Sequence, residues 1–385
     1  MPALSSHPLP PLEFAESKRG LRVTPLAPEV TPRPTLRELG LHVTPTPIGV
    51  RATPLPPSGV RLTPTPPSVA RKTTKPRLPK LLAGRYSVDR YLDQGGTSRV
   101  YLGWDELCED DIVIKVLTDE AARCDVLRSH FLVGSRAALA VVHENVVRVL
   151  AVREPEVGAP YLVMELLKGE LLADLLDRRP QLSARATLSL AAQTAAGLGA
   201  LHAAGIVHCD LKPENLFVTS TPSAAKLVKI LDFGLAEVRG ERTAHEAPSV
   251  RGTAQYMAPE QVLGDPVDAR TDVYALGVVM FRMLTGQLPF DLKLSATLLR
   301  HQLTSKAPPP SWLREDLDPN VEAIVLKAMR KNPENRYASA AVLLADLERV
   351  QNGGGIEPAR EASVIDAYTP QSAQGEKAAQ MLGVD

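Results

Sequence analysis

Proline is unevenly distributed along this chain, and its distribution separates a segment that cannot build a packed core from one that can. Residues 1–80 contain 18 of the 34 prolines. Each proline removes a backbone hydrogen-bond donor and disfavours helix in the residue before it. We therefore expect residues 1–80 to form an extended, disordered arm with polyproline II character, and the folded part of the chain to begin near Tyr86.

The arm also carries a repeat and an excess of positive charge. Gly49–Ser58 (GVRATPLPPS) and Gly59–Ser68 (GVRLTPTPPS) are tandem ten-residue units, and looser copies begin at Gly20 and Gly40. Residues 1–80 contain twelve Lys or Arg against four Asp or Glu, so the neutral chain joins a basic arm to an acidic body. Two interpretations stay open. The arm is either a low-complexity spacer or an array of docking motifs or phosphorylatable threonines for a protein partner.

Cysteine usage and hydropathy limit the compartment and the partners. Cys108, Cys124 and Cys209 form neither a paired spacing nor a metal-ligand cluster, which is typical of a reduced, cytoplasmic setting. No run of 18 or more apolar residues occurs, so we expect no membrane span. The N-terminus lacks the apolar stretch of a secretory signal. We expect protein partners and no nucleic acid.

Apolar periodicity beyond the arm predicts an α+β fold with two lobes. We expect a domain over residues 86–350, with a small β-rich N-lobe (86–165) and a larger helical C-lobe (166–350), followed by a flexible tail over 351–385. The strand-like runs are Tyr86–Leu92, Arg99–Trp104, Asp111–Leu117, Val146–Val152, Tyr161–Leu166 and Leu227–Leu231. The helical stretches are Ala121–Val142, Ala184–Ala203, Thr271–Leu284, Pro319–Arg330 and Ala338–Val350.

Two features of the β-rich part have both a structural and a functional interpretation. Leu92–Val100 (LDQGGTSRV) lies between two strand-like runs. It is either an ordinary hairpin turn or a glycine-rich turn whose backbone N–H groups approach phosphate oxygens. Lys115 ends an apolar strand, where a lysine is costly unless it meets an anion or extends to solvent.

Two polar motifs in the helical part are more specific. Residues 208–215 read HCDLKPEN, and Asp232-Phe233-Gly234 follows a strand-like run 17 residues past Asn215. Two carboxylates and an amide at the ends of neighbouring loops suit a divalent metal and a proton acceptor. In this order and spacing the set resembles the catalytic loop and metal-binding loop of protein kinases.

Later residues agree with this resemblance. Residues 252–260 (GTAQYMAPE) resemble the end of a kinase activation segment, and Asp272 begins a segment similar to the buried helix of the larger lobe. Arg336 matches the arginine that in the family pairs with the glutamate of this segment, here Glu260. The resemblance covers about residues 86–350 and is closest to the bacterial members of the eukaryotic-type (Hanks-type) Ser/Thr protein kinases.

The resemblance implies transfer of the γ-phosphate of ATP to Ser or Thr of a protein in intracellular signalling. It implies that Asp210 orients the substrate hydroxyl and accepts its proton, that Lys212 steadies the γ-phosphate, and that Asn215 and Asp232 bind Mg²⁺ or Mn²⁺. Met164 would be the gatekeeper beside the adenine. The implied nucleotide contacts are Leu92, Asp93, Gln94, Gly95, Gly96, Thr97, Ser98, Arg99, Val100, Lys115, Glu165 and Leu167.

Three departures from the family pattern keep a second function class open. Only the second glycine of G-x-G-x-x-G survives, as Gly95, with Asp93 and Ser98 at the flanking positions. The register of the segment before His143-Glu144-Asn145 puts Gly134 where the family has a glutamate, so Lys115 would lack its usual partner, although Glu120 and Asp125 lie upstream. Cys209 replaces the arginine that normally binds a phosphorylated activation loop, so Thr243 and Ser249 are not expected to switch activity. The alternatives are an active Ser/Thr kinase and a pseudokinase-like scaffold.

Overall fold

The computed structural model describes residues 81–220, 226–233, 237–238, 254–290, 296–356 and 368–382. The predicted arm over 1–80 lies outside these residues. Thr243 and Ser249, which were considered as phosphorylation sites of the activation loop, also lie outside them.

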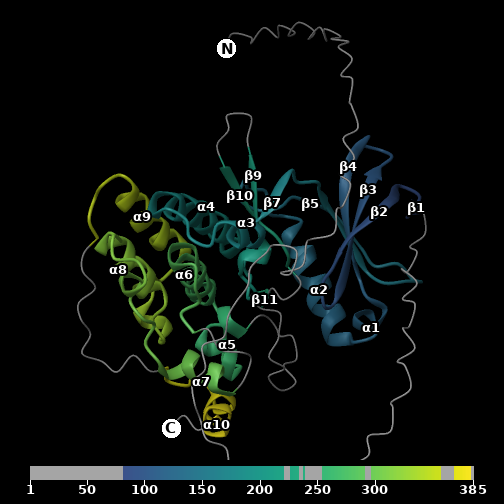
Figure 1. The fold of residues 1–385 in the computed structure, drawn as a ribbon. Coiled ribbons are helices and arrows are strands. Elements are labelled where there is room, and N and C mark those ends of the chain that lie inside the picture. The colour runs from purple at the N-terminus through teal and green to yellow at the C-terminus, as the bar shows by residue number, and fades with distance from the viewer. Residues whose placement is uncertain are drawn as a thin grey trace, which may run out of the picture. The chain divides into compact units, whose positions relative to one another are not determined.

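The first part of the described chain is a six-stranded sheet in which every pair of neighbouring strands is antiparallel, with the order β1-β2-β3-β4-β6-β5 (Figure 1). Strand β4 is central and buried from Ile112 onward. Side chains alternate between faces along a strand. Ile114 and Val116 therefore pack on one face with Tyr86 and Tyr101, whereas Lys115 points to the other. The strands are β1 (Leu81–Leu82), β2 (Tyr86–Gln94), β3 (Ser98–Asp105), β4 (Asp110–Leu117), β5 (Val149–Arg153) and β6 (Tyr161–Glu165).

Two helices follow β4 and pack against the sheet. Thr118 caps the first helix, because its hydroxyl accepts a hydrogen bond from the N–H of Ala121. The second helix buries Phe131 and Leu132 in a cluster with Leu117 and Leu162. The sequence predicted one helix over Ala121–Val142, and the structure has α1 (Asp119–Ala122) and α2 (Asp125–Ala138).

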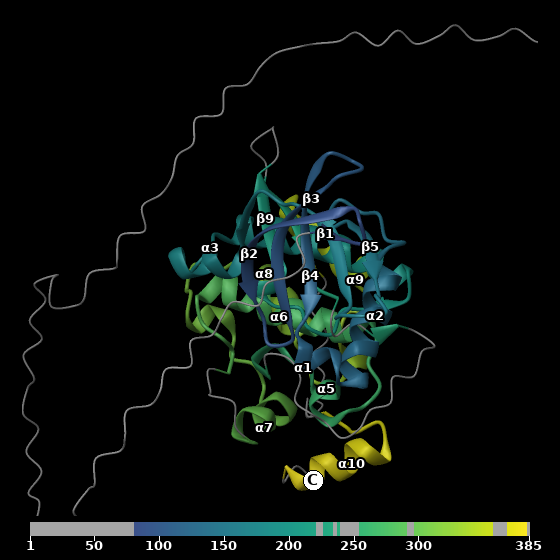
Figure 2. The ribbon, with the colours of Figure 1, turned by 90° about the vertical axis from the view of Figure 1, so that its right-hand side faces the viewer.

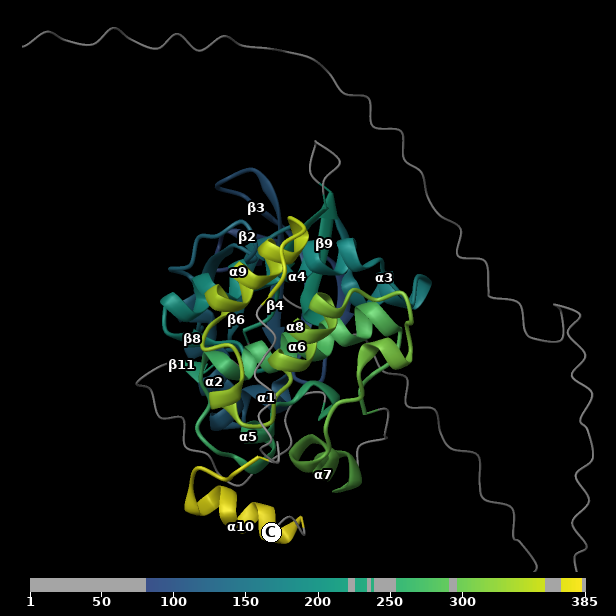
Figure 3. The same cartoon turned by 90° about the vertical axis from the view of Figure 1, so that its left-hand side faces the viewer.

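The second part is mainly helical and is built around helix α6 (Figure 3). Fourteen of the residues in α6 are buried, so this helix is a core element on all sides rather than an amphipathic one. Among the described residues, no helix combines the length and the apolar character needed to cross a membrane. The helices of this part are α3 (Leu172–Arg178), α4 (Ala184–Ala203), α5 (Pro259–Leu263), α6 (Ala269–Thr285), α7 (Ala296–Thr304), α8 (Pro319–Ala328), α9 (Ala340–Gln351) and α10 (Ala373–Met381).

Short strands join the two parts and carry the polar motifs. One small sheet has the order β10-β9-β7 and another pairs β11 with β8. Val146 forms an isolated parallel bridge with Ile230, so the connection before β5 lies beside the end of β10. These strands are β7 (Gly169–Leu171), β8 (Ile206–Val207), β9 (Leu216–Ser220), β10 (Lys226–Ile230) and β11 (Glu237–Val238), with 3₁₀ turns at Pro213–Asn215, Ala254–Tyr256, Pro310–Trp312 and Pro333–Asn335.

The predicted order of a β-rich part followed by a helical part is confirmed, but the predicted flexible tail over 351–385 is wrong for its described residues. Helix α9 continues to Gln351, and residues 368–382 contain α10, which packs against α5 (Figure 2). Tyr368 is buried there. The sequence of the tail alone did not predict this helix, because the residues that hold the segment, such as Asp265, lie about a hundred positions earlier in the chain.

Candidate active site

The loop between β8 and β9 holds Asp210, and one buried carboxylate shapes it. Asp272, in the first turn of α6, accepts hydrogen bonds from the backbone N–H of His208 at 2.8 Å and of Cys209 at 2.9 Å. His202 Nε2 lies 2.8 Å from the same carboxylate. The loop that carries Asp210 is therefore attached through its backbone to the most buried helix of the protein.

The pKa of Asp272 reflects this setting. Burial alone would raise the pKa of Asp272, but the hydrogen bond from His202, the nearby imidazoles and the backbone N–H of His208 outweigh it. The net result is a pKa below the ordinary value of an aspartate. The carboxylate is thus negative when it holds the loop.

His208 links the two polar motifs. Its Nδ1 accepts a hydrogen bond from the N–H of Asp210 at 3.2 Å, and its Nε2 lies 2.8 Å from the carbonyl oxygen of Leu231. These two contacts assign the proton to Nε2, because the carbonyl oxygen can only accept. One imidazole ring therefore fixes the spacing between Asp210 and the residue before Asp232.

Two residues of the site have left-handed backbone conformations that a side chain normally disfavours. Cys209 has φ of 63° and Asp232 has φ of 61°. Each such conformation costs about 1–2 kcal/mol in an L-residue that is not glycine. Strain of this kind persists only where the surrounding contacts impose it, and here the backbone of Cys209 is held by Asp272 and Gln261.

The Asp210 carboxylate is held by a cation and an amide. Lys212 Nζ lies 2.9 Å and 3.2 Å from its two oxygens. Asn215 Nδ2 donates to the carbonyl oxygen of Asp210 at 2.7 Å and to its carboxylate at 3.1 Å. The three residues that the sequence placed in the catalytic loop therefore form one hydrogen-bonded group.

Lys115 crosses from the sheet to the second motif. Its ammonium group forms an ion pair with Asp232, and its side chain is 10% exposed against 33% for that of Asp232. Phe233 is buried beside the ring of His208. The buried lysine of an apolar strand thus meets an anion of the chain itself, and its contact with nucleotide phosphates stays a prediction.

The sequence left Lys115 either without an acidic partner or paired with Glu120 or Asp125, and the structure shows neither arrangement. Gly134 is buried within α2, as the register predicted. Glu120 and Asp125 are exposed, and among the described residues the ion pair of Lys115 is the one with Asp232. The lysine is oriented by Asp232, which follows β10, and not by an acid of α1 or α2.

The glycine-rich hairpin is open to solvent. Leu92, Asp93, Gln94, Gly95, Gly96 and Thr97 are exposed, Ser98 is buried, and Arg99 and Val100 are intermediate. The N–H of Gly95 donates to the carbonyl oxygen of Ser98 at 2.9 Å, which closes the turn. A side chain at Gly95 would approach only Ser98, at 3.9 Å.

The end of β6 is joined to β10 by the side chain of Lys229, which sequence reasoning missed. Lys229 Nζ lies 2.8 Å from Glu165 Oε1, which also accepts from the backbone N–H of Arg148 at 2.7 Å. The N–H of Glu165 donates to Arg148. Leu167 and Met164 are partly buried and pack against the main helical core. The only sequence signal for the ion pair was a lysine in an otherwise apolar strand.

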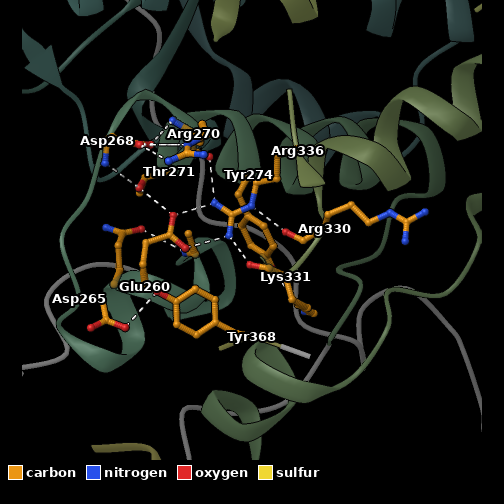
Figure 4. A network of polar contacts seen from close by, with 12 residues as sticks. Glu260, Asp265, Asp268, Arg270, Thr271, Tyr274, Arg330, Lys331, Arg336 and Tyr368 are labelled. Carbon is orange, nitrogen blue, oxygen red and sulfur yellow. Dashed lines mark hydrogen bonds and ion pairs between the residues drawn. The ribbon is translucent and has the colours of Figure 1, made fainter. Parts of the chain in front are cut away.

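Helix α5 contributes Glu260 to a buried ion pair (Figure 4). Arg336 binds Glu260 through two parallel contacts of 2.7 Å and 2.8 Å, and Thr271 donates to the same carboxylate at 2.8 Å. This confirms the pairing that the resemblance implied. Next to Glu260, Gln261 Nε2 donates to the carbonyl oxygen of Cys209 at 2.7 Å, so α5 supports the catalytic loop directly.

The residues expected to hold a cation have the right chemistry. Both hydrogen bonds of the Asn215 side chain come from Nδ2, which leaves its Oδ1 as an oxygen ligand beside Asp210. Hard divalent cations prefer such amide and carboxylate oxygens. Within the described part of the chain there is no cluster of three or more His, Cys, Asp or Glu that would suggest a separate metal site.

Comparison with known proteins decides the family. The family model described as "Protein kinase domain" matches residues 86–346, more than half of the chain. This chain belongs to the protein kinase family. The α+β fold with two lobes and the resemblance to bacterial Ser/Thr kinases are thereby confirmed.

Two similar curated proteins are bacterial kinases. This kinase is 37% identical over 292 residues to the serine/threonine-protein kinase PknB of Mycobacterium tuberculosis, which covers 74% of this chain and 46% of the relative. It is 38% identical over 316 residues to the serine/threonine-protein kinase Pkn1 of Myxococcus xanthus, which covers 78% of this chain and 44% of the relative. The kinase thus spans less than half the length of these relatives.

A solved structure shows the same fold. The PknI kinase domain of Mycobacterium tuberculosis superposes with a TM-score of 0.57 and 24% identity, covering 70% of this chain and 98% of that chain. At this identity the likeness describes the fold alone.

Proposed function

We propose that this kinase transfers the γ-phosphate of ATP to Ser or Thr hydroxyls of proteins, with Mg²⁺ or Mn²⁺. The observation that carries the proposal is the ion pair between Lys115 and Asp232. His208 connects it to the hydrogen-bonded group of Asp210, Lys212 and Asn215, because its ring contacts both Asp210 and Leu231. Phosphoryl transfer requires positioning and charge neutralisation more than covalent chemistry. Cations and an oriented carboxylate, as found here, supply both.

Each residue has a role within this proposal. Asp210 would accept the hydroxyl proton of the substrate, and Lys212 would neutralise charge on the transferred group. Asn215 and Asp232 would hold the cation. Lys115 would exchange part of its contact with Asp232 for the α- and β-phosphates.

The nucleotide would enter between the hairpin and the end of β6. The hairpin over 92–100 would cover the phosphates, and Glu165 and Leu167 would contact adenine through their backbone. Because the N–H of Glu165 is already bonded to Arg148, its carbonyl oxygen is the group we assign to adenine. Two of the three family glycines are absent from the hairpin, so backbone approach to the phosphates should be looser than in a complete glycine-rich loop.

Activity is favoured over a scaffold role because Lys115, Asp210, Asn215 and Asp232 are all retained. Lys115 is held in the site by Asp232, so the absence of an acid at Gly134 leaves it oriented. We place the reaction in the cytoplasm because Cys108, Cys124 and Cys209 are all free thiols. The arm over 1–80 is proposed to dock a protein partner, on its sequence repeat alone.

The test is transfer of radiolabel from γ-labelled ATP to a Ser/Thr peptide, with the full chain and either cation. Asp210→Asn should lower turnover by about 10²–10⁴-fold while ATP binding survives. Asp232→Asn should also weaken metal-dependent nucleotide binding. Asp174→Asn, an exposed aspartate of α3, is the matched control and should behave as wild type. Full activity in either site variant, or label on tyrosine, would contradict the proposal.

A further inference from the structure

Asp265 is a buried carboxylate outside the active site, and its side-chain partners come from the C-terminal segment. It is 4% exposed and directly follows Gly264, which ends α5 in a left-handed conformation. Its Oδ2 accepts from the hydroxyl of Tyr368 at 3.0 Å and from the N–H of Gln371 at 2.9 Å. Its Oδ1 accepts from the hydroxyl of Ser372. Asp265 and Tyr368 face each other in Figure 4.

The same segment covers apolar side chains of α5 and α7. Tyr368 and Ala379 belong to a cluster separate from the main helical core. The cluster also contains Ala254 and Met257, which precede α5. Its other members are Val262, Leu263, Phe290, Leu298 and Leu303. Without the segment these side chains would form a continuous apolar patch, and such patches on soluble proteins commonly bind other proteins.

The fit between α10 and Asp265 is close enough to require glycine. Ser372 caps α10 by accepting from the N–H of Gly375 at 3.0 Å, so the positive end of the helix dipole faces the carboxylate. A β-carbon at Gly375 would lie 2.4–2.6 Å from the Asp265 carboxylate. The Tyr368 N–H also donates to the carbonyl oxygen of Leu303 at 3.1 Å. This is a built recognition site for one specific segment.

The covered face adjoins the region that must admit a protein substrate. Gln261, in the helix that Asp265 follows, holds the carbonyl oxygen of Cys209 at 2.7 Å, next to Asp210. Ala254 and Met257, which belong to the apolar cluster that the segment covers, precede this helix directly in the chain. A protein that presents a hydroxyl to Asp210 therefore approaches the surface that residues 368–382 occupy.

We propose that residues 368–382 are a detachable intramolecular ligand of a protein-docking face formed by α5, α7 and residues 254–257, and that they compete there with protein substrates. This proposal rests on the proposed kinase function. Asp265 recognises three features of this ligand. They are the hydroxyl of Tyr368, the serine that caps α10, and the glycine three residues after that serine. A protein substrate must displace these contacts, whereas a short peptide reaches Asp210 without doing so.

The full chain offers an opening variant and a matched control. Gly375→Ala places a β-carbon against the Asp265 carboxylate, while alanine favours helix more than glycine does. A loss of docking would therefore come from the steric conflict and not from a weaker helix. Gly355→Ala is the control, because its β-carbon would meet only Asn320 Oδ1, at 3.6 Å.

Docking is measured first, without reference to catalysis. Amide hydrogen exchange of residues 373–381 should be at least tenfold faster in Gly375→Ala than in wild type and unchanged in Gly355→Ala. A labelled synthetic peptide of residues 368–382 should bind the Gly375→Ala chain at least tenfold more tightly than wild type, whose face is occupied. Exchange in wild type at the rate of the free peptide would overturn the docked state, and failure of the peptide to bind Gly375→Ala would overturn its role as a ligand.

Competition is measured next, with an Asp210→Asn copy of the full chain as protein substrate and a short Ser/Thr peptide as reference. Gly375→Ala should raise kcat/KM for the protein at least fivefold and leave the short peptide unchanged. A parallel fall for both substrates would show that the segment supports the site instead of covering a docking face, and an unchanged protein rate would exclude competition. Absence of transfer to both substrates in wild type would contradict the kinase function, yet it would leave the exchange and binding results intact.

Discussion

Replacement of Asp272 by asparagine tests how the catalytic loop is held. The carboxylate accepts from His208 N–H, Cys209 N–H and His202. Asparagine retains one acceptor oxygen, so one backbone N–H would face an amide NH₂ group and lose its partner. Loss of one hydrogen bond to a buried charge costs about 1.5–3 kcal/mol, and the remaining bonds lose the strengthening that a charged acceptor gives.

We therefore expect Asp272→Asn to lower the free energy of unfolding by about 3–5 kcal/mol, the range for breaking a buried charged network. The kcat should fall at least tenfold, because the loop that carries Asp210 loses its attachment to α6. Chemical denaturation and steady-state kinetics on a short peptide measure the two effects. Asp268→Asn is the control, since Asp268 caps the same helix and asparagine caps a helix about as well.

The difference between wild type and Asp272→Asn should also depend on pH. The folded-state pKa of Asp272 is lowered, so its stabilisation is complete above the unfolded-state pKa of about 3.9. It is lost as the pH falls through the lower folded-state pKa. The stability difference should thus be constant near neutral pH and shrink below about pH 4. A stability loss under 1 kcal/mol with unchanged kcat would refute the role assigned to Asp272.

Four further substitutions test other parts of the structure. Arg336→Met leaves Glu260 buried without its bidentate partner and should cost about 3–5 kcal/mol of unfolding free energy in chemical denaturation; a loss below 1 kcal/mol would show that the pair is not needed. Gly277→Ala puts a β-carbon 2.8–2.9 Å from the side chains of Met329 and Ala328 and should destabilise by about 1–3 kcal/mol. Gly199→Ala, with nothing within 4 Å, should instead stabilise by up to about 1 kcal/mol; equal melting shifts would contradict this packing. Lys115→Met should abolish most label transfer at an almost unchanged melting temperature, and retained transfer would remove the lysine from the proposed mechanism.

The fold could be predicted from sequence where apolar periodicity was long and uninterrupted. Helix α4 has the bounds Ala184–Ala203 that the periodicity indicated, and the buried run of β4 was recognised as a strand. Strands of two or three residues, such as β8 and β11, carry too few positions for a period to be seen. Helix α10 was missed because it is short and alanine-rich, and its stability comes from Asp265, which periodicity within the segment does not reveal.

In the candidate site, too, residues within short motifs could be predicted from sequence, whereas contacts between distant parts of the chain could not. Asp210, Asn215 and Asp232 could be named from one stretch of sequence and one short motif. The partner of Lys115 could not, because the choice between an acid of the following helices and Asp232 depends on how a strand of the sheet lies against a loop of the helical part. Asp272 was recognised as the start of a buried helix, but its hydrogen bonds to the catalytic loop arise only from tertiary packing.

The left-handed backbone at Cys209 and Asp232 has a consequence for how this protein trades stability against activity. Two such residues together cost about 2–4 kcal/mol, a sizeable part of the 5–15 kcal/mol that typically separates folded from unfolded states. Glycine adopts this conformation freely. Replacement of Cys209 by glycine would therefore remove strain and raise the melting temperature, but it would leave the orientation of Asp210 less fixed. A more stable variant of this protein is therefore not necessarily a more active one, because the strained backbone that lowers stability also orients the residues of the site.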